Sequence, residues 1–243
     1  MQKSVVILGA LVLILGVAGA AQADTVAIAL CVDSSGSIGV TNWEKQLDAY
    51  KSALDTYITT DGSIAVGVWN FSTSVLNQYT LTVIDSQTDK DTLLEKFTYG
   101  HANALTFQNG TTDIAGAINA ADDALIALDN NVTDSYTWDK LIIDVSTDGN
   151  QVGGLGDPET YADEAITHGI DQVNAIFIEG FSGLNTSWVP DGSFSITVSD
   201  FDDDFADGIS RKIATETGVV PLPAAAWMGL GLLGLLGATR RLR

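Results

Sequence analysis

The 243-residue sequence is poor in basic residues, histidine and cysteine. Its 11 lysines and arginines face 31 aspartates and glutamates, so the formal net charge is −20. This balance argues against nucleic acid and anionic lipid surfaces as partners, because both would repel the chain, and it favours the attraction of cations. The one cysteine, Cys31, excludes an internal disulfide, and its place within an apolar stretch predicts a small buried core residue.

The first 23 residues have the pattern of an export signal. Lys3 supplies a positive start, residues 5–17 form an apolar core, and Ala21-Gln22-Ala23 is a small-residue cleavage site. We therefore predict a signal peptide over residues 1–23, which is removed on export through the inner membrane.

The C-terminal end combines a proline-containing motif, an apolar run and a basic cluster. The motif is Val220-Pro221-Leu222-Pro223-Ala224, residues 224–238 are apolar, and Arg240, Arg241 and Arg243 follow. As a helix, the apolar run would span only about 22 Å, short of the ~30 Å hydrocarbon core of a bilayer. On its own it is a marginal membrane anchor.

Together these three features resemble the C-terminal sorting signals of Gram-negative envelopes, in the V-P-L-P-A variant that exosortases process. The resemblance implies an exosortase-type processing enzyme as a partner, cleavage within residues 218–243, and delivery to the cell surface or the extracellular matrix. A single-pass tail anchor is the alternative. In either case the segment contacts the membrane at least transiently, with its arginines on the cytoplasmic side.

Residues 24–217 remain as one predicted domain. They keep 7 of the 11 basic residues and all 31 acidic ones, so their formal charge is 7 − 31 = −24. Apolar stretches of strand length alternate with segments of helical period along nearly all of this domain. The expected strands are 26–32, 64–71, 75–84, 141–145, 173–178 and 194–198. The expected helices are 41–59, 88–97, 114–128, 158–168 and 201–213.

This alternation predicts an α/β fold, a doubly wound three-layer sandwich with a mostly parallel central sheet. Residues 75–84 are expected to form an antiparallel edge strand. Thr41 and Glu44 are spaced as a capping box for the first helix. No Gly-x-Gly-x-x-Gly loop follows the first strand, so a dinucleotide site has no support.

Oxygen donors follow two of the predicted strands and open one of the helices. Asp33, Ser35 and Ser37 form a D-x-S-x-S pattern after the first strand, Thr112 opens the third helix, and Asp148 follows the fourth strand. Open α/β sheets bind their ligands at the carboxyl ends of the strands, where these side chains would meet. Oxygen donors without soft ligands suit Mg²⁺ better than zinc, with Mn²⁺ or Ca²⁺ as alternatives.

These motifs resemble a von Willebrand factor A domain with a metal-ion-dependent adhesion site. The matching segments are 32–38 with its D-x-S-x-S, 110–118 with its threonine, and 146–149 with its aspartate, while 143–146 and 198–201 are similar to a small exported bacterial subgroup. The resemblance covers roughly residues 25–216 and implies the Rossmann-like doubly wound fold.

The resemblance also implies roles for the predicted site residues. Ser35, Ser37 and Thr112 would hold the ion directly or nearly so, and Asp33 and Asp148 would orient its waters. Thr111 stands where many members of the family have a second glycine, so Thr111 and Thr112 both stay open as the donor, although the spacing to Ala117 favours Thr112.

Neutral hydroxyls around the ion would leave it poorly neutralised, so it should accept an acidic oxygen from a partner. We therefore predict an exported A domain that binds an acidic group of a protein or polysaccharide through a divalent cation, and not an enzyme. The rival is a structural envelope or matrix component in which the ion only stabilises the fold. A hydrolase is disfavoured, because Ser35 stands where an aspartyl phosphotransfer motif needs a second aspartate.

We predict no metal site at two other places in the sequence that carry charged residues. Asp200, Asp202, Asp203 and Asp204 resemble an EF-hand loop, but Phe205 occupies the position that requires glycine. We expect these carboxylates to open the last helix, with Arg211 and Lys212 near its end, as the helix dipole favours. Asp144 lies inside a predicted central strand and needs a buried partner, which the sequence does not name.

Overall fold

The computed structural model describes residues 24–131, 136–179, 184–202 and 204–218. The predicted signal peptide and the predicted sorting signal beyond Gly218 lie outside these residues. Six strands form one sheet: β1 (Val26–Asp33), β2 (Ile64–Phe71), β3 (Val75–Val83), β4 (Lys140–Thr147), β5 (Gln172–Ile178) and β6 (Ser195–Val198). Five helices accompany them: α1 (Gly39–Tyr57), α2 (Gln87–Lys96), α3 (Ile114–Asp129), α4 (Pro158–His168) and α5 (Phe205–Glu216).

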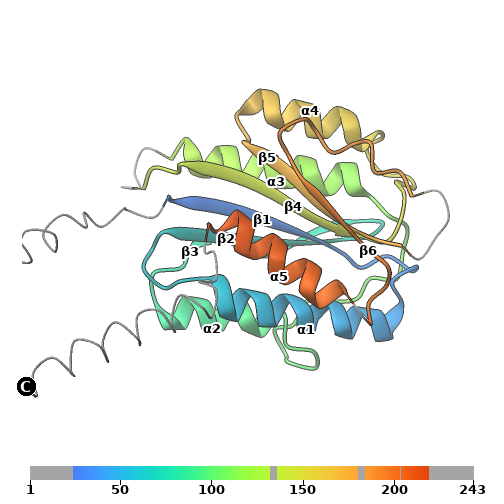
Figure 1. The fold of residues 1–243 in the computed structure, drawn as a ribbon, viewed down its shortest axis with the longest axis horizontal. Helices are drawn as coiled ribbons and strands as arrows, with labels where there is room; N and C mark the ends of the chain where they lie inside the picture. The colour runs from blue at the N-terminus through green and yellow to red at the C-terminus, as the bar shows by residue number, and fades with distance from the viewer. Residues whose placement is uncertain (1–23, 132–135, 180–183, 203, 219–243) are drawn as a thin grey trace, which may run out of the picture.

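The sheet confirms the predicted fold class. Its strand order is β3-β2-β1-β4-β5-β6, with β3 antiparallel to β2 at one edge and every other pair parallel. Helices α1, α2 and α5 cover one face, and α3 and α4 cover the other (Figure 1). The result is a three-layer α/β sandwich.

Strand β1 runs through the centre of this sandwich and is buried on both faces. Alternate side chains of a strand point to opposite faces, and the sequence uses both. Val26, Ile28, Leu30 and Val32 pack in the core beneath α1, α2 and α5. Ala27, Ala29 and Cys31 pack in the core beneath α3 and α4, so the predicted burial of Cys31 is confirmed.

The start of α1 differs from the prediction. The helix begins at Gly39 with Ile38 at the N-cap and no side-chain cap, so Thr41 and Glu44 lie inside it and form no capping box. Ile38 is buried, and its N–H bonds to the Ser35 carbonyl at 3.2 Å. The tight loop after β1 therefore leads directly into the helix, and no separate capping residue is needed.

Helix α4 begins and ends as predicted. The Asp157 side chain accepts a hydrogen bond from Glu159 N, and Pro158 occupies the first turn. Gly169 ends the helix at a φ of 115°, a left-handed conformation that side chains other than glycine rarely adopt. Within the described part of the chain, no helix is long and apolar enough to cross a bilayer.

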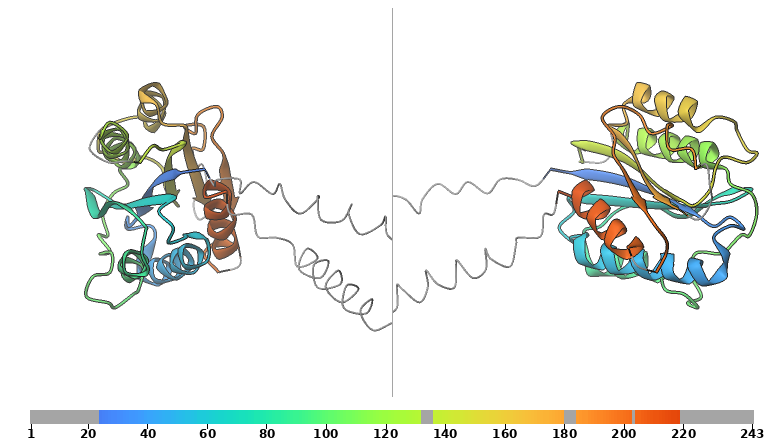
Figure 2. Two further views of the ribbon diagram at one scale, coloured as in Figure 1. Left: turned by 90° about the vertical axis from the view of Figure 1, so that its left-hand side faces the viewer. Right: turned by 45° about the vertical axis from the view of Figure 1, so that its right-hand side comes forward.

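The strand order reverses between β1 and β4, which is where open α/β sheets bind their ligands. From β1 the chain moves through α1 to β2 on one side, and from β4 it moves through α4 to β5 on the other. Such a reversal separates the loops at the carboxyl ends of the two strands and leaves a crevice between them. Figures 1 and 2 show that this end of the sheet lies opposite the end where β1 starts and α5 finishes.

Candidate metal centre

Asp33 is the last residue of β1 and is fully buried. Its Oδ2 accepts a hydrogen bond of 2.6 Å from Thr147 Oγ1, and its Oδ1 accepts one of 2.7 Å from Ser35 N. Its backbone carbonyl accepts a third, of 2.8 Å, from Gln46 Nε2 on α1. Contacts from β4, α1 and its own loop thus fix this carboxylate at the strand end.

Ser35, Ser37 and Asp148 form a chain of oxygens across the crevice. The hydroxyls of Ser35 and Ser37 lie 3.1 Å apart, and Ser37 Oγ donates to Asp148 Oδ1 at 2.7 Å. Ser37 belongs to the loop after β1 and Asp148 directly follows β4. The tertiary structure therefore brings together side chains that are 111 residues apart in the sequence.

Thr112 reaches the same cluster, and Thr111 does not. A Cβ atom placed on Gly149, next to Asp148, would lie 3.2 Å from Thr112 Oγ1 and 3.8 Å from Ser37 Oγ. The Thr111 side chain is exposed and turns to Thr73, with its N and Oγ1 at 3.0 and 3.1 Å from Thr73 Oγ1. Of the two threonines that the sequence left open, Thr112 is the one beside the other predicted site residues.

A close approach of two loops sets the position of Thr112. Gly36 N donates to the Gly110 carbonyl at 2.8 Å, and Gly110 N donates to Ser72 Oγ at 2.8 Å. A Cβ on Gly110 would lie only 2.2 Å from Thr73 Oγ1. Glycine is required here because any side chain would push the loop before α3 away from the loop after β1.

Burial disfavours ionisation of both site carboxylates in the absence of a cation. It raises the pKa of Asp33 to about 7, although hydrogen bonds from Thr147 and Ser35 oppose the shift. Burial also raises the pKa of Asp148, against the hydrogen bond from Ser37. A bound cation would reverse both shifts by favouring the charged carboxylates.

The donor chemistry fits a hard divalent cation. Three hydroxyl oxygens and two carboxylates face one crevice, and the five side chains include neither sulfur nor imidazole. Only two of them are carboxylates, and no group of three or more acidic, histidine or cysteine side chains in the described residues is placed to hold a metal. Hydroxyls would therefore have to supply much of the coordination, with water completing it.

Sequence reasoning missed two supporting residues, Thr147 and Gln46. Each left a signal. Thr147 is a polar residue at the buried end of β4, and Gln46 interrupts the apolar stripe of α1 between Trp43 and Leu47. Both are fully buried, and both hold Asp33 in place.

The buried partner of Asp144 is Lys212, which was predicted only to lie near the end of the last helix. Lys212 is fully buried on α5. Its ammonium pairs with Asp144 and lies 3.3 Å from Glu216 Oε1. Asp204 takes the N-cap position of α5, and its carboxylate accepts hydrogen bonds from Ser199 N at 3.1 and 3.2 Å. The helix begins at Phe205, later than the predicted residue 201, so Asp200 and Asp202 precede it and Asp204 takes the capping position.

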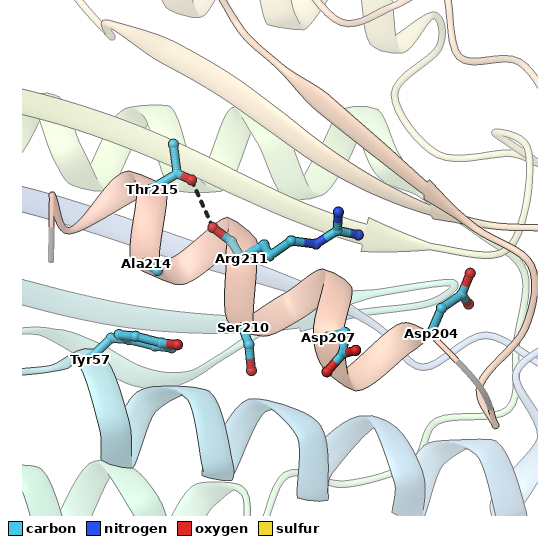
Figure 3. Close-up of a pocket in the computed structure, with 7 residues that line it drawn as sticks. All are labelled: Tyr57, Asp204, Asp207, Ser210, Arg211, Ala214 and Thr215. Carbon is cyan, nitrogen blue, oxygen red and sulfur yellow. Dashed lines mark hydrogen bonds between the residues drawn. The ribbon is translucent and has the colours of Figure 1, made fainter. Parts of the chain in front are cut away.

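Described residues on the α5 side of the molecule line a larger and a smaller hollow. One, of about 840 Å³, runs along α5 with Tyr57 of α1 facing it, and none of the predicted metal residues lines it (Figure 3). The other, of about 290 Å³, is lined by both Ser37 and Asp148. The smaller pocket is therefore the one that adjoins the candidate metal centre.

Comparisons with solved structures show the same fold in other proteins. Proximal thread matrix protein 1 from the mussel byssus superposes with a TM-score of 0.63 at 19% identity, covering 79% of this chain and 48% of that one. This chain thus spans about half the length of the mussel protein. Another structure of that protein has zinc in its MIDAS motif, with a TM-score of 0.56 at 20% identity over 79% of this chain and 46% of that one.

Two bacterial proteins are also similar. A von Willebrand factor type A protein from Catenulispora acidiphila has a TM-score of 0.60 at 15% identity, covering 81% of this chain and 43% of that one. BatB from Bacteroides thetaiotaomicron has a TM-score of 0.55 at 20% identity, covering 79% of this chain and 99% of that one. At such identities the likeness establishes the fold alone, which is that of a von Willebrand factor A domain.

No curated protein matches the chain. A protein family described as "Protein of unknown function (DUF1194)" matches residues 23–220, which include every residue of the sheet and the candidate metal centre. The chain therefore belongs to the DUF1194 family and has the fold of a von Willebrand factor A domain.

Proposed function

We propose that this domain binds an acidic group of a protein or polysaccharide through a divalent cation. Ser35, Ser37 and Thr112 would hold the cation, and Asp33 and Asp148 would orient its waters. The observation that carries the proposal is the convergence of these five side chains, from three separate segments, at the crevice between β1 and β4. A cation held largely by neutral hydroxyls keeps net positive charge and can accept an acidic oxygen from a ligand.

Mg²⁺ is the specific ion that we propose. Hydroxyl, carboxylate and water oxygens match the ligands of Mg²⁺, whereas structural zinc sites use mainly cysteine and histidine. The mussel matrix protein with zinc in its MIDAS motif supports a divalent cation as a class. Mn²⁺, Ca²⁺ and Zn²⁺ therefore belong in the same titration.

The chemistry of the centre supports binding and not catalysis. The chain has two histidines, and neither lines the pocket beside the centre. His168 is paired with Asp122 at the end of α4, and His101 lies in a loop near Glu95. Asp33, which could act as a nucleophile only if exposed, is fully buried and holds hydrogen bonds from Thr147 and Ser35.

The position of the centre supports a role at the cell surface. The centre and the end of α5 lie at opposite ends of the sheet (Figures 1 and 2). A domain tethered through the residues after α5 would thus present the centre away from its tether. The similar structures include an aerotolerance-related membrane protein and a pilus adhesin, which agrees with our proposal of export and surface delivery.

The metal centre is tested by isothermal titration calorimetry of the full chain with each divalent cation. We expect one saturable Mg²⁺ site. Thr112→Val, which removes the hydroxyl and keeps the side-chain shape, should weaken Mg²⁺ binding by about 10-fold to 100-fold. Thr111→Val is the matched control and should change it little. The absence of a saturable site for every cation would overturn the proposal.

A structural matrix role is the rival, and the mussel thread matrix protein favours it. If the ion only stabilises the fold, a chelator should lower the thermal stability without releasing a partner. If the ion bridges to a ligand, proteins or polysaccharides retained by the immobilised chain should elute with chelator while the circular dichroism spectrum stays native. Mass spectrometry of the mature chain separately tests the predicted cleavage of both ends.

A further inference from the structure

A lysine, an aspartate and a glutamate meet in the core between the sheet and the last helix. Asp144 lies in the middle of β4, and Lys212 and Glu216 lie one turn apart on α5. Asp144 and Lys212 are 0% exposed, and Glu216 is 2% exposed. The Lys212 Nζ atom lies against Asp144 Oδ2 and 3.3 Å from Glu216 Oε1. An amine and two carboxyls therefore share one buried site that the proposed function does not use.

The ionic form leaves polar atoms of this site unsatisfied. Lys212 Nζ carries three N–H donors as an ammonium. Neither Nζ nor Asp144 Oδ2 makes a hydrogen bond of normal geometry with any residue that the structure describes, although the two atoms are in contact. Buried polar groups normally have partners, and two buried charges lose much hydration energy. A neutral product of the two groups would remove both costs.

Loss of one water molecule turns the two charged groups into a neutral amide. A proton first passes from the Lys212 ammonium to the Asp144 carboxylate, which gives an amine and a carboxylic acid. The nitrogen then forms a bond to the side-chain carbonyl carbon, the C–OH bond breaks, and the hydroxyl leaves with one amine hydrogen as water. The amide keeps one N–H donor in place of three, and the step needs no oxidant, cofactor or metal.

The fold supplies the proximity that this reaction needs. Groups held in the right geometry react as if at about 10⁵–10⁸ M, and Lys212 and Asp144 are already in contact. Burial also favours the neutral forms of both groups, which are the reactive ones. The Tyr50 hydroxyl donates a hydrogen bond to Asp144 Oδ1 at 3.3 Å. This bond marks Oδ1 as the oxygen that stays in the amide and Oδ2, beside the amine, as the one that leaves.

Glu216 is placed to move the protons. Burial and the nearby Asp144 carboxylate raise the pKa of Glu216 well above its ordinary value, which favours a carboxylic acid that can donate a proton. Its Oε1 lies 3.3 Å from Lys212 Nζ and accepts a hydrogen bond of 3.0 Å from Asn174 Nδ2. Glu216 can therefore give a proton to the leaving hydroxyl and take one from the nitrogen.

We propose that Lys212 and Asp144 condense into an intramolecular isopeptide bond, with Glu216 as the acid–base group. The ion pair in the structure is the arrangement from which the bond forms. The product joins α5 covalently to the central strand β4. The inference does not rest on the proposed function, because none of the three residues belongs to the candidate metal centre.

Such a bond would do in this chain what disulfides do in others. The single cysteine, Cys31, excludes an internal disulfide. A cross-link stabilises a protein mainly by restricting its unfolded chain. Helix α5 also leads into the C-terminal residues that we propose as the tether. A pull on that tether would reach the central sheet through a covalent bond, and α5 would not peel away from it.

Mass spectrometry of the denatured full chain tests the proposal. We expect a mass lower by one water molecule than the sequence between the observed ends. Trypsin cuts after free lysine and arginine, and neither residue occurs between 140 and 211. The digest should therefore contain peptide 141–211 joined to the peptide that begins at Lys212, with no cut after Lys212. Lys45 and Lys140, which form exposed ion pairs, are internal controls and should be cut normally.

Three variants test the roles of the residues. Lys212→Arg keeps the positive charge but replaces the amine with a guanidinium, so the full sequence mass is expected. Asp144→Asn should lose ammonia in place of water. Glu216→Gln keeps the side-chain shape and should slow bond formation by about 100-fold or more, as measured by mass at intervals after refolding from urea. Circular dichroism checks the fold of each variant.

The wild-type chain decides the proposal even if a variant fails to fold. A full sequence mass in folded wild-type protein would overturn it. So would a loss of water confined to the peptide that begins at Lys212, because that result indicates a bond to Glu216 within the helix. Unchanged kinetics in folded Glu216→Gln would overturn the acid–base role of Glu216.

Discussion

Two aspartates four residues apart, Asp144 within β4 and Asp148 just past its end, have opposite surroundings. Asp144 lies in the middle of β4 in the core, paired with Lys212 and accepting a hydrogen bond of 3.3 Å from the Tyr50 hydroxyl. Asp148 lies just past the end of β4, bonded to a serine hydroxyl at the mouth of a pocket. Asp144 is paired within the protein, and in our proposal Asp148 serves a cation and its ligand.

The interior cluster is nearly balanced in charge. Burial and the neighbouring Asp144 raise the pKa of Glu216 well above its ordinary value, which favours its protonated form. One carboxylate, Asp144, then faces one ammonium, Lys212. Asn174 Nδ2 donates to Glu216 Oε1 at 3.0 Å and completes the contacts between β5 and α5. Among the residues that the structure describes, no lysine or arginine pairs with Asp33 or Asp148, which is why we expect a cation from solution there.

The largest expected effect comes from removing the interior cation. Lys212→Met should lower the free energy of unfolding by about 3–5 kcal/mol, because it leaves a buried carboxylate unpaired. Urea unfolding measures the change. Lys140→Met is the matched control. Lys140 lies on β4, the strand that carries Asp144, but it is 43% exposed and pairs with Asp24 at 3.2 Å. A loss below about 1 kcal/mol for Lys212→Met would contradict the role of Lys212 as the stabilising partner of Asp144.

The next effect concerns the metal centre alone. Asp33→Asn keeps the shape of the side chain and removes its charge, so Mg²⁺ affinity should fall by about 10-fold to 100-fold while the fold persists. Calorimetry measures the affinity, and circular dichroism checks the fold. Asp48→Asn, at an exposed position of α1, should leave the affinity unchanged. Less than a threefold change for Asp33→Asn would contradict the assignment.

The pH dependence of Mg²⁺ binding follows from the raised pKa of Asp33, about 7. In the metal-free protein Asp33 takes up a proton as the pH falls through this value, and a protonated carboxyl binds cations poorly. Affinity should therefore be highest above about pH 7 and fall below it, by up to tenfold per pH unit. Mg²⁺ titrations at several pH values measure the affinity. An affinity that rises as the pH falls would contradict the prediction.

The raised pKa of Asp33 also affects the stability of the metal-free protein, which changes with pH in the opposite direction to the Mg²⁺ affinity. A carboxyl whose pKa is raised on folding stabilises the protein most below its unfolded pKa, near 4, and this contribution is lost as the pH rises through about 7. Saturating Mg²⁺ should restore the loss. The increase in melting temperature on adding Mg²⁺ should thus be larger at about pH 8 than at about pH 6.

The smallest effect is expected at the rim of the smaller pocket, which Asp202 lines. Lys45 pairs with Asp202, as Lys212 pairs with Asp144, but the two side chains are 34% and 70% exposed. Lys45→Met should therefore cost below about 1 kcal/mol in the free energy of unfolding. Urea unfolding under the conditions used for Lys212→Met gives the direct comparison, and an equal loss in the two variants would contradict the role we assign to burial.

Much of the fold could be predicted because the apolar pattern is local. Strand β2 lies at the predicted residues, and β1 extends one residue further, to Asp33. Helix α4 was predicted from Asp157, Pro158 and Gly169. The start of α1 was not predicted. Thr41 and Glu44 have the capping pattern, but the backbone hydrogen bond from Ile38 N to the Ser35 carbonyl closes a tight loop that leads into the helix at Gly39.

The candidate site was predictable only in outline. The polar residues at the ends of two strands pointed to Asp33, Ser35, Ser37 and Asp148, and the resemblance to von Willebrand factor A domains implied that they share one metal site. The choice between Thr111 and Thr112 depended on which hydroxyl Thr73 engages, a contact across 38 residues. The supports from Thr147 and Gln46, and the smaller pocket, are likewise contacts between distant segments.

The sequence by itself determined the α/β class, the central buried strand and the chemical type of the site, since periodicity and donor type are properties of short segments. The tertiary structure decided which polar residues meet. It buried Lys212 against Asp144 and left Asp148 at a pocket, although both aspartates belong to the same stretch of the chain. The physical reason is that ionic contacts act through space, and the strand order β2-β1-β4-β5 sets which side chains are close enough to interact.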